Sequence, residues 1–368
     1  MPHLLERLER FDWTLVTAAI VLAALGLVEI YGIGVSREPA DLFPFYKQLV
    51  AALLGLTAIV VLISLDYRQM KAYSFLLYLG GGLLLTTVLF FGHTIRHTQG
   101  WFRLGSLSFQ PVEIAKVTLT IYLAALFARR SHGRLSWREF GLSGCATFAY
   151  AALVFLQPDF GSGMVLVGIW VLLSLFARLP HRAWFFLPLA VLALSGLVWS
   201  VGLKPYQQER ILTFLHPGSD PRGASYNAAQ AHIAIGSGGW FGKGIGEGSQ
   251  ARLRFLPAAA TDFMFAVIGE ELGFIGISIV LGLFLLILYR FIRLAEESGE
   301  DFAALLLIGL GAGFLIHITV NGGMNLGIMP ITGLPMPFLS AAASSLVVAF
   351  ISIGLAESVA IKRRGKGE

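Results

Sequence analysis

Long apolar stretches alternate with short polar ones along almost the whole chain. Each apolar stretch has about 20 residues, the length that an α-helix needs to cross the hydrocarbon core of a bilayer. Because a membrane-spanning segment must satisfy its own backbone hydrogen bonds, runs of this length predict helices. The pattern predicts an all-α polytopic membrane protein with about ten transmembrane helices, over residues 13–33, 46–65, 72–92, 111–128, 141–157, 160–177, 183–201, 262–289, 303–322 and 336–360.

The longest polar connection, residues 202–261, lies between the seventh and eighth predicted spans. A loop of this length is commonly functional. Two of its segments, 206–215 and 228–235, carry apolar residues at helical spacing. We expect both segments to be helices that lie in the membrane interface.

Basic residues concentrate in every second loop and at the two ends of the sequence. Cytoplasmic loops of membrane proteins carry an excess of lysine and arginine, whereas long loops are translocated regardless of their charge. The distribution predicts a multi-pass protein of the cytoplasmic (inner) membrane with both termini in the cytoplasm. Loop 202–261 is then extracellular.

Composition supports one integral membrane domain over residues 1–368, because 56% of the residues are hydrophobic and only 13% are charged. A soluble domain carries about 25% charged residues. The net charge of +5 comes from loop residues that follow the topology, so it does not indicate nucleic acid as a partner. Cys145 is the one cysteine, which excludes an intrachain disulfide and a cysteine-based metal site.

Glu113 and Lys116 are ionisable residues at the outer start of the fourth predicted span, directly after Gln110 and Pro111. A spacing of three places both side chains on one face of a helix. Ionisable residues within a span are expensive and therefore mark functional sites. A self-satisfied ion pair explains the two residues equally well.

Two aspartates are predicted at the same outer level. Asp159 lies in the turn between the fifth and sixth spans, and Asp262 opens the eighth span behind Thr261, a possible N-cap. Each aspartate alone is explained as a turn or helix-start residue, which complements the helix dipole. Together with Glu113, Lys116 and the cations of the long loop, they converge as a site for an anionic, membrane-bound substrate requires.

Three other features favour structural roles. Glu270 and Glu271 are adjacent on a predicted helix and so are not expected to face one pocket, and we expect one of them to pair within the bundle. The glycine-rich stretch 236–246 lacks the residues of a phosphate-binding loop at the required positions, which favours a flexible loop. His317, inside the ninth span, is expected to be a hydrogen-bonded core histidine.

Several segments resemble the SEDS family (shape, elongation, division and sporulation proteins). The resemblance runs in order from the first span to the last, and the short chain ends favour the elongation type, RodA, over the division type, FtsW. The segments that carry it are Ser108–Lys116, Gln157–Gly161, Phe255–Phe274, Asn321–Asn325 and Thr332–Ser340. One departure is that Ala341, Ala342 and Ala343 replace the usual tyrosine and glycines, so no role is carried over to those positions.

The resemblance implies a peptidoglycan glycosyltransferase that polymerises lipid II, the undecaprenyl-diphosphate-linked disaccharide, at the outer face of the membrane for cell elongation and shape. It also implies a class B penicillin-binding protein as partner. The essential aspartate of the family falls on Asp262, and its nearby charged residues fall on Glu113, Lys116 and Asp159.

The chemistry expected of such a site is an inverting sugar transfer in which Asp262 takes a proton from the attacking hydroxyl. Lys116, loop cations or a divalent cation (Mg²⁺ or Mn²⁺) would stabilise the leaving diphosphate. No organic cofactor and no protein metal ligands are predicted. Beyond Asp262, the residues expected to bind substrate or support its charge are Glu113, Lys116, Asp159, Arg210, Gln230 and Lys243.

Two other functions are open at this point. Membrane carboxylates and a lysine also suit a lipid II flippase, although such sites usually lie at the midplane between inverted repeats, and no such repeat is evident. A non-catalytic scaffold of the cell-wall machinery would not require Asp262 at all.

Overall fold

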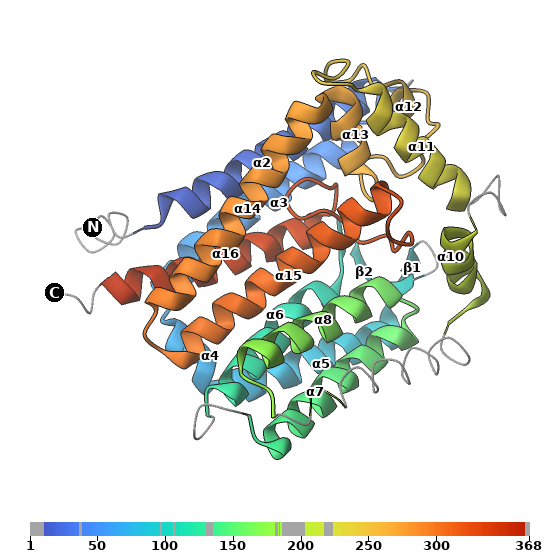
Figure 1. Ribbon diagram of the computed structural model, residues 1–368. Coiled ribbons are helices and arrows are strands. Elements are labelled where there is room, and N and C mark those ends of the chain that lie inside the picture. Colours follow the sequence, from blue (N-terminus) through green and yellow to red (C-terminus); the bar gives the residue numbers. More distant parts are fainter. Residues whose placement is uncertain are drawn as a thin grey trace.

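The computed structural model describes residues 11–36, 39–95, 98–105, 107–129, 135–180, 183, 185, 203–216 and 224–364. Its long helices run roughly side by side in one bundle (Figure 1). They are α2 (Trp13–Val35), α3 (Phe43–Ser64), α5 (Ser74–Phe91), α6 (Pro111–Phe127), α7 (Trp137–Leu156), α8 (Phe160–Phe176), α14 (Gly273–Glu297), α15 (Asp301–Asn325) and α16 (Ala343–Arg364).

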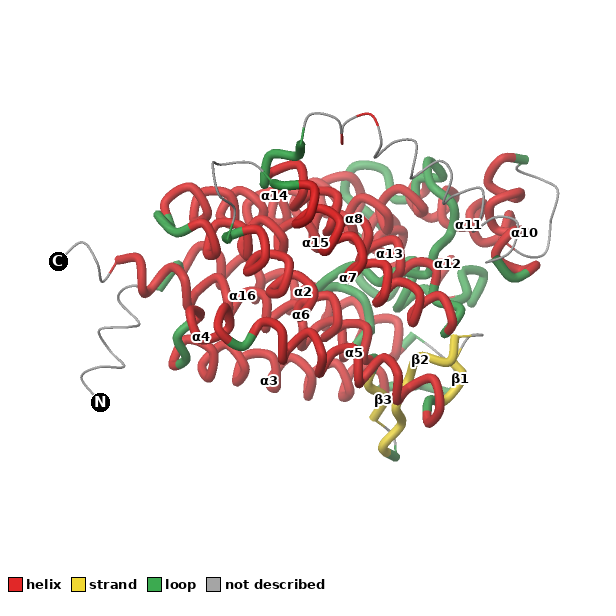
Figure 2. The backbone as a smooth tube through the Cα atoms, turned by 90° about the horizontal axis from the view of Figure 1, so that it is seen from below, coloured by secondary structure: helices red, strands yellow, loops and turns green. Residues whose placement is uncertain are grey.

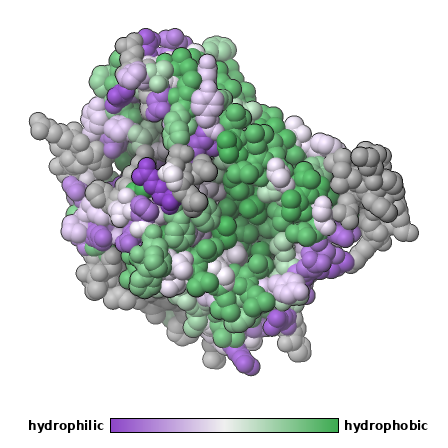
Figure 3. Space-filling model, turned by 180° about the vertical axis from the view of Figure 1, so that it is seen from behind, coloured by the Kyte–Doolittle hydropathy of each residue, from purple (hydrophilic) through white to green (hydrophobic). Residues whose placement is uncertain are grey.

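Membrane spans are confirmed by the length and hydropathy of these helices. Among the described residues, seven helices are long and apolar enough to cross a membrane, and α8 is a shorter apolar helix. Large apolar side chains cover much of the outer surface of the bundle (Figure 3). The predicted all-α polytopic fold is therefore confirmed. The seventh predicted span, 183–201, lies almost entirely outside the described residues.

The two ends of the bundle differ in structure. At one end, called the terminal end, the backbone N–H of Asp12 donates to Glu357 Oε2 at 2.9 Å, which joins the start of α2 to α16. The opposite end, called the loop end, carries three strands and the short helices α10 (Pro205–Leu215), α11 (Ala224–Ser237) and α12 (Ser249–Arg252) (Figures 1 and 2). The two helices predicted in the long loop are confirmed as helices.

Close helix packing depends on small residues. A side chain at Gly55 of α3 would lie 2.4 Å from the ring of Phe350 on α16. At Gly309 of α15 it would lie 2.5 Å from Thr120 of α6 and 2.9 Å from Leu173 of α8. In a membrane, where apolar burial against lipid gives little driving force, such close contacts hold helices together. Helix α15 consequently lies at the centre of the bundle beside α6 and α8.

A small antiparallel sheet at the loop end is not predicted by the sequence pattern. Its strands are β1 (His93–Ile95), β2 (Thr98–Leu104) and β3 (Leu107–Phe109), paired in that order. The sheet fills the connection between α5 and α6. It places Ser108 and Gln110 directly before the buried start of α6, where Glu113 lies.

The eighth predicted span, 262–289, is wrong as one continuous helix. The structure has a short helix, α13 (Met264–Glu271), then a reversal at Leu272 and Gly273, and then α14. A side chain at Gly269 would lie 3.0 Å from Ile277, whereas eight residues of a continuous helix rise about 12 Å. Gly273 has φ +68°, a conformation that an L side chain rarely adopts.

The tenth predicted span, 336–360, begins too early. Residues 329–336 form no helix, and α16 starts at Ala343. Pro330, Pro335 and Pro337 explain the difference, because proline has no N–H to donate to a helix and restricts the residue before it. The extended segment becomes a wall of the site described next.

Candidate functional site

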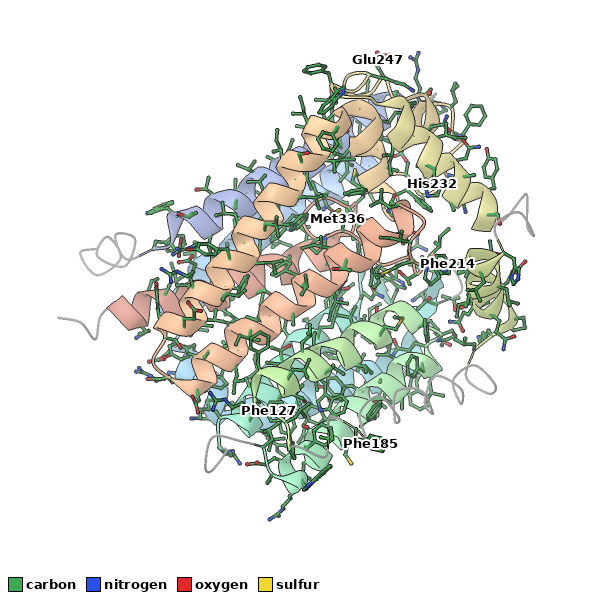
Figure 4. All side chains as sticks on the ribbon, viewed as in Figure 1. Phe127, Phe185, Phe214, His232, Glu247 and Met336 are labelled. Atoms are coloured by element: carbon green, nitrogen blue, oxygen red, sulfur yellow. The ribbon has the colours of Figure 1, made fainter. Side chains whose placement is uncertain are left out.

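An open cleft at the loop end brings together residues from six parts of the chain. Its volume is about 290 Å³, and it is lined by four of the predicted site residues, Glu113, Asp159, Arg210 and Asp262. The predicted convergence of charged residues at one end of the bundle is therefore observed for these four. Figure 4 labels Met336, which lies inside the bundle, and Phe214, which lies on α10.

Asp262 is held in the cleft through its backbone. Its N–H donates to Ala258 O at 3.0 Å, and its carbonyl oxygen accepts from Asn321 Nδ2 at 3.0 Å and from Asn325 Nδ2 at 3.3 Å. The carboxylate faces the extended wall, since Oδ2 lies 3.7 Å from the position of a Cβ atom at Gly333. Its side chain is partly buried and lines the cleft.

Thr261 does not cap a helix, contrary to the sequence expectation. Helix α13 begins at Met264, and no side chain caps it. The Thr261 hydroxyl instead donates to Ala258 O at 3.2 Å. Asp262 therefore lies before the helix rather than in its first turn, which weakens the effect of the helix dipole on its carboxylate.

Glu113 and Lys116 form the predicted ion pair on one face of α6. Lys116 Nζ lies 2.8 Å from Glu113 Oε1, and the two side chains are 8% and 5% exposed. Lys116 Nζ also lies 2.9 Å from His317 Nε2 on α15, so His317 is confirmed as a hydrogen-bonded core histidine. Glu113 lines both the cleft and a second cavity of about 60 Å³, whereas Lys116 lines the second cavity and not the cleft. Lys116 is therefore not a cation of the cleft itself.

Asp159 caps a helix, as its structural interpretation predicts, and also lines the cleft. Its Oδ1 accepts from Ser162 N–H at 3.0 Å and so caps α8, and its Oδ2 accepts from Gln110 Nε2 at 3.1 Å. Burial raises the pKa of the Asp159 carboxyl above its ordinary value. The residue ties α8 to the start of α6 at the edge of the cleft.

The three predicted loop residues lie in different places. Arg210, on α10, reaches the cleft and its Nη1 lies 3.4 Å from Ile331 O. Gln230, on α11, is half-buried and does not line the cleft. Lys243 also lies outside it and pairs with Glu270 at 2.8 Å. Of these three, Arg210 alone is positioned to contact a ligand in the cleft.

Sequence reasoning missed Lys47 of α3, a second cation that lines the cleft. Its Nζ donates to Ser108 Oγ at 2.5 Å, which holds the ammonium beside the end of β3. A single lysine near the start of a span is usually interpreted as a topology signal. Lys47 lies inside the predicted span 46–65, and this position is the one sequence signal that marks it as a candidate site residue. Ala341, Ala342 and Ala343, the positions that depart from the family pattern, also line the cleft.

Glu270 and Glu271 both reach the segment around Gly248, although the sequence predicts that they do not face one pocket; the expected pairing of one of them is observed. Glu270 accepts from Lys243, Ser249 and Gln250, and Glu271 Oε2 accepts from Gly246 N–H at 2.7 Å. A side chain at Gly248 would lie about equally close to both carboxylates, at 3.0 and 2.9 Å. The glycine-rich loop wraps around the end of α13 and satisfies both glutamates, so their role is structural.

The carboxylates that line the cleft are of a type that binds metal ions. Within the described ranges, no three or more His, Cys, Asp and Glu side chains are placed to hold one ion. Mg²⁺ is commonly bound by one or two carboxylates together with substrate phosphates rather than by a protein cage. The cleft carboxylates would hold such an ion only together with substrate phosphates.

The sequence matches the model of the cell cycle protein family that includes FtsW, RodA and SpoVE, over residues 12–365. The chain belongs to this family. It is 32% identical over 372 residues to a probable peptidoglycan glycosyltransferase FtsW of Geobacter sp. (strain M18), covering 98% of this chain and 100% of the relative. It is 30% identical over 421 residues to the peptidoglycan glycosyltransferase RodA of Treponema pallidum, covering 95% and 97%.

A solved structure shares the fold of this FtsW/RodA/SpoVE family member. A chain of a peptidoglycan synthase complex that coordinates polymerization and crosslinking superposes with a TM-score of 0.79 and 33% identity, covering 96% of this chain and 98% of that chain. The SEDS resemblance is confirmed, and the protein is a peptidoglycan glycosyltransferase. FtsW and RodA relatives match at nearly equal identity, so the matches do not distinguish division from elongation.

Proposed function

We propose that this peptidoglycan glycosyltransferase polymerises lipid II into glycan strands in the cleft at the loop end, with Asp262 as general base. The observation that carries the proposal is the cleft itself, which places the Asp262 carboxylate in one space with Lys47 and Arg210. A transfer from a diphospho-sugar requires a proton acceptor and cations for the leaving group. Both types of group are present on its walls.

Asp262 has the position that a general base requires. Its partly buried side chain lines the cleft, while two asparagines of α15 hold its carbonyl oxygen. A fixed backbone limits the positions of the carboxylate, and accurate positioning of a base contributes to the rate. The attacking hydroxyl of one sugar would give its proton to this carboxylate as its oxygen bonds to the anomeric carbon of the other sugar. The bond from that carbon to the diphosphate then breaks, which inverts the configuration.

The leaving diphosphate requires positive charge, and the cleft supplies it from two elements. Lys47 lies on α3 and Arg210 on α10, so cations from two different elements line the cleft. Lys47 and Arg210 take this role in place of Lys116, because Lys116 is committed to Glu113 and His317. Lys116 then acts by fixing the carboxylate of Glu113, which lines the cleft.

The proposal also includes an orientation of the protein in the membrane and a protein partner. The loop end would face the outside of the cell, with both termini in the cytoplasm, because the basic loops lie on the terminal side. We further propose a class B penicillin-binding protein as partner and a role in cell elongation. The similar chain in a synthase complex that couples polymerization to crosslinking supports such a partner.

The deciding experiment supplies purified protein with lipid II and measures glycan products by length on a gel. Asp262→Asn keeps the shape of the side chain but cannot accept the proton, and general-base catalysis contributes about 10²–10⁴-fold. We expect polymerisation to fall by that factor with unchanged thermal stability. Asp301→Asn, at the exposed start of α15, is the matched control and should remain active. Full activity of Asp262→Asn would remove the residue from the mechanism.

A further inference from the structure

His317 joins two parts of the site without lining the cleft. Its buried ring lies on α15, with Nε2 2.9 Å from Lys116 Nζ of α6 and Nδ1 3.0 Å from the carbonyl oxygen of Pro335. Pro335 belongs to the extended wall that faces Asp262. The ring therefore bridges the Glu113–Lys116 ion pair and this wall.

The two partners of His317 determine its tautomer. A carbonyl oxygen only accepts hydrogen bonds, so the hydrogen of the ring must be on Nδ1, which faces Pro335. An ammonium only donates, so Nε2 must present its lone pair to Lys116. A neutral ring with its hydrogen on Nδ1 satisfies both contacts, whereas a doubly protonated ring would place a donor against the Lys116 ammonium.

A second residue of α15 holds the same wall one helical turn later. Asn321 Nδ2 donates to Leu334 O at 2.7 Å and to Asp262 O at 3.0 Å. His317 and Asn321 are four residues apart and so lie on one face of the helix. Together they fix two successive carbonyl groups of the wall, and Asn321 also fixes the backbone of Asp262. The distance between the wall and Asp262 is thus set from α15.

We propose that His317 is a positioning residue for the glycosyl transfer, linking the Glu113–Lys116 ion pair to wall residues 332–335. Loss of its bond to Pro335 would release that residue of the wall, while Asn321 still holds the neighbouring Leu334. A displacement of about 1 Å at a reacting centre can cost 10²-fold in rate. The inference rests on the proposed role of Asp262 as base, since the wall acts on the reaction by its place opposite that residue.

The test compares His317→Leu, His317→Gln and His317→Asn in the lipid II assay. Leucine removes both contacts, and we expect kcat to fall by about 10- to 100-fold with a much smaller change in KM. Glutamine carries an acceptor and a donor on one side chain of similar reach, so it should recover most of the rate. Asparagine is shorter and should not span both partners. Thr147→Val, which removes a bond within α7 only, is the control for loss of a buried polar group.

Assays at a temperature well below the thermal midpoint of each variant separate positioning from stability. A merely structural histidine would lower the midpoint and leave kcat unchanged in the folded protein. If His317→Leu does not accumulate in membranes, the Gln and Asn variants still decide, because equal wild-type kcat in both would overturn the proposal.

A double-variant cycle with Lys116→Met adds an independent test. Residues that act as one unit show effects on the rate that do not multiply. We therefore expect the Lys116→Met/His317→Leu protein to be about as slow as the slower single variant, and multiplication of the two effects would contradict the link. Asp262→Asn is measured alongside: an active Asp262→Asn protein refutes the base, whereas an inactive one with active His317 variants refutes the positioning role alone.

Discussion

Lys243 Nζ lies 2.8 Å from Oε1 of Glu270, whose side chain is fully buried at the end of α13. The same oxygen accepts from Ser249 Oγ at 2.9 Å. A buried carboxylate is costly unless it is paired and hydrogen-bonded. Lys243 is therefore the counter-ion that lets the glycine-rich loop close over α13, and substrate binding is not required to explain its charge.

Lys243→Met should destabilise the protein rather than slow its chemistry. The change leaves Glu270 with its Ser249 and Gln250 bonds but without a cation, which costs about 1–3 kcal/mol for a buried acceptor that loses a partner. Thermal unfolding in detergent measures this loss, and the added change Glu270→Gln should restore much of it. An unchanged unfolding midpoint with a raised KM for lipid II would return Lys243 to the substrate site.

The helices of this protein were largely predictable, because lipid imposes a length and a composition on each span. The i, i+3 spacing also predicted that Glu113 and Lys116 meet, since both lie on one uninterrupted helix. Local rules failed where the chain reverses. Nothing in the apolar run 262–289 shows that Gly273 adopts φ +68° and folds α13 back against α14.

Local sequence rules also could not predict where the cations of the long loop lie. Arg210 and Lys243 lie in one long loop and are equivalent by composition, yet one lines the cleft and the other pairs with Glu270. Their places depend on how α10–α13 pack, which is a long-range property of the fold. Lys47 was overlooked for a related reason: its distance to Ser108 is set by the small sheet, which the hydrophobic pattern does not predict.

The Glu113–Lys116 pair should contribute to both stability and activity. Lys116→Met leaves Glu113 as a buried carboxylate without its cation, and breaking one side of such a pair costs about 3–5 kcal/mol. The double change Glu113→Gln/Lys116→Met removes both charges and should regain most of that stability. We expect glycan synthesis to remain severely reduced in the double variant. A stable double variant with wild-type activity would show that the pair serves folding alone.

Topology is testable with two exposed glutamates at opposite ends of the bundle. Glu247 lies beside α12 at the loop end, and Glu296 lies near the end of α14 at the terminal end. In a Cys145→Ala background, a membrane-impermeant thiol reagent applied to intact cells should label Glu247→Cys and spare Glu296→Cys. Permeabilised cells provide the control, because both cysteines should then react. The reverse pattern in intact cells would place the cleft on the cytoplasmic side.

Lys47 and Arg210 should bind the diphosphate of the substrate as a pair. Charge-assisted hydrogen bonds contribute about 1.5–3 kcal/mol, so Lys47→Met and Arg210→Met should each reduce kcat/KM by about 10- to 100-fold. Inorganic pyrophosphate gives a second readout that needs no turnover. It should inhibit the wild-type enzyme in competition with lipid II, and inhibition should weaken in both variants because a cation is lost from the cleft.

Arg252→Met is the matched control for these two changes. Arg252 lies at the same end of the protein, but its side chain is 53% exposed and pairs at 3.2 Å with the exposed Glu247. Exposed pairs contribute little and are screened by salt, so neither kcat/KM nor pyrophosphate inhibition should change. If Arg252→Met weakens pyrophosphate inhibition as much as Lys47→Met does, the effect reflects the overall charge of the loop end. Inhibition that is equal in wild type and both cleft variants would place the diphosphate outside this cleft.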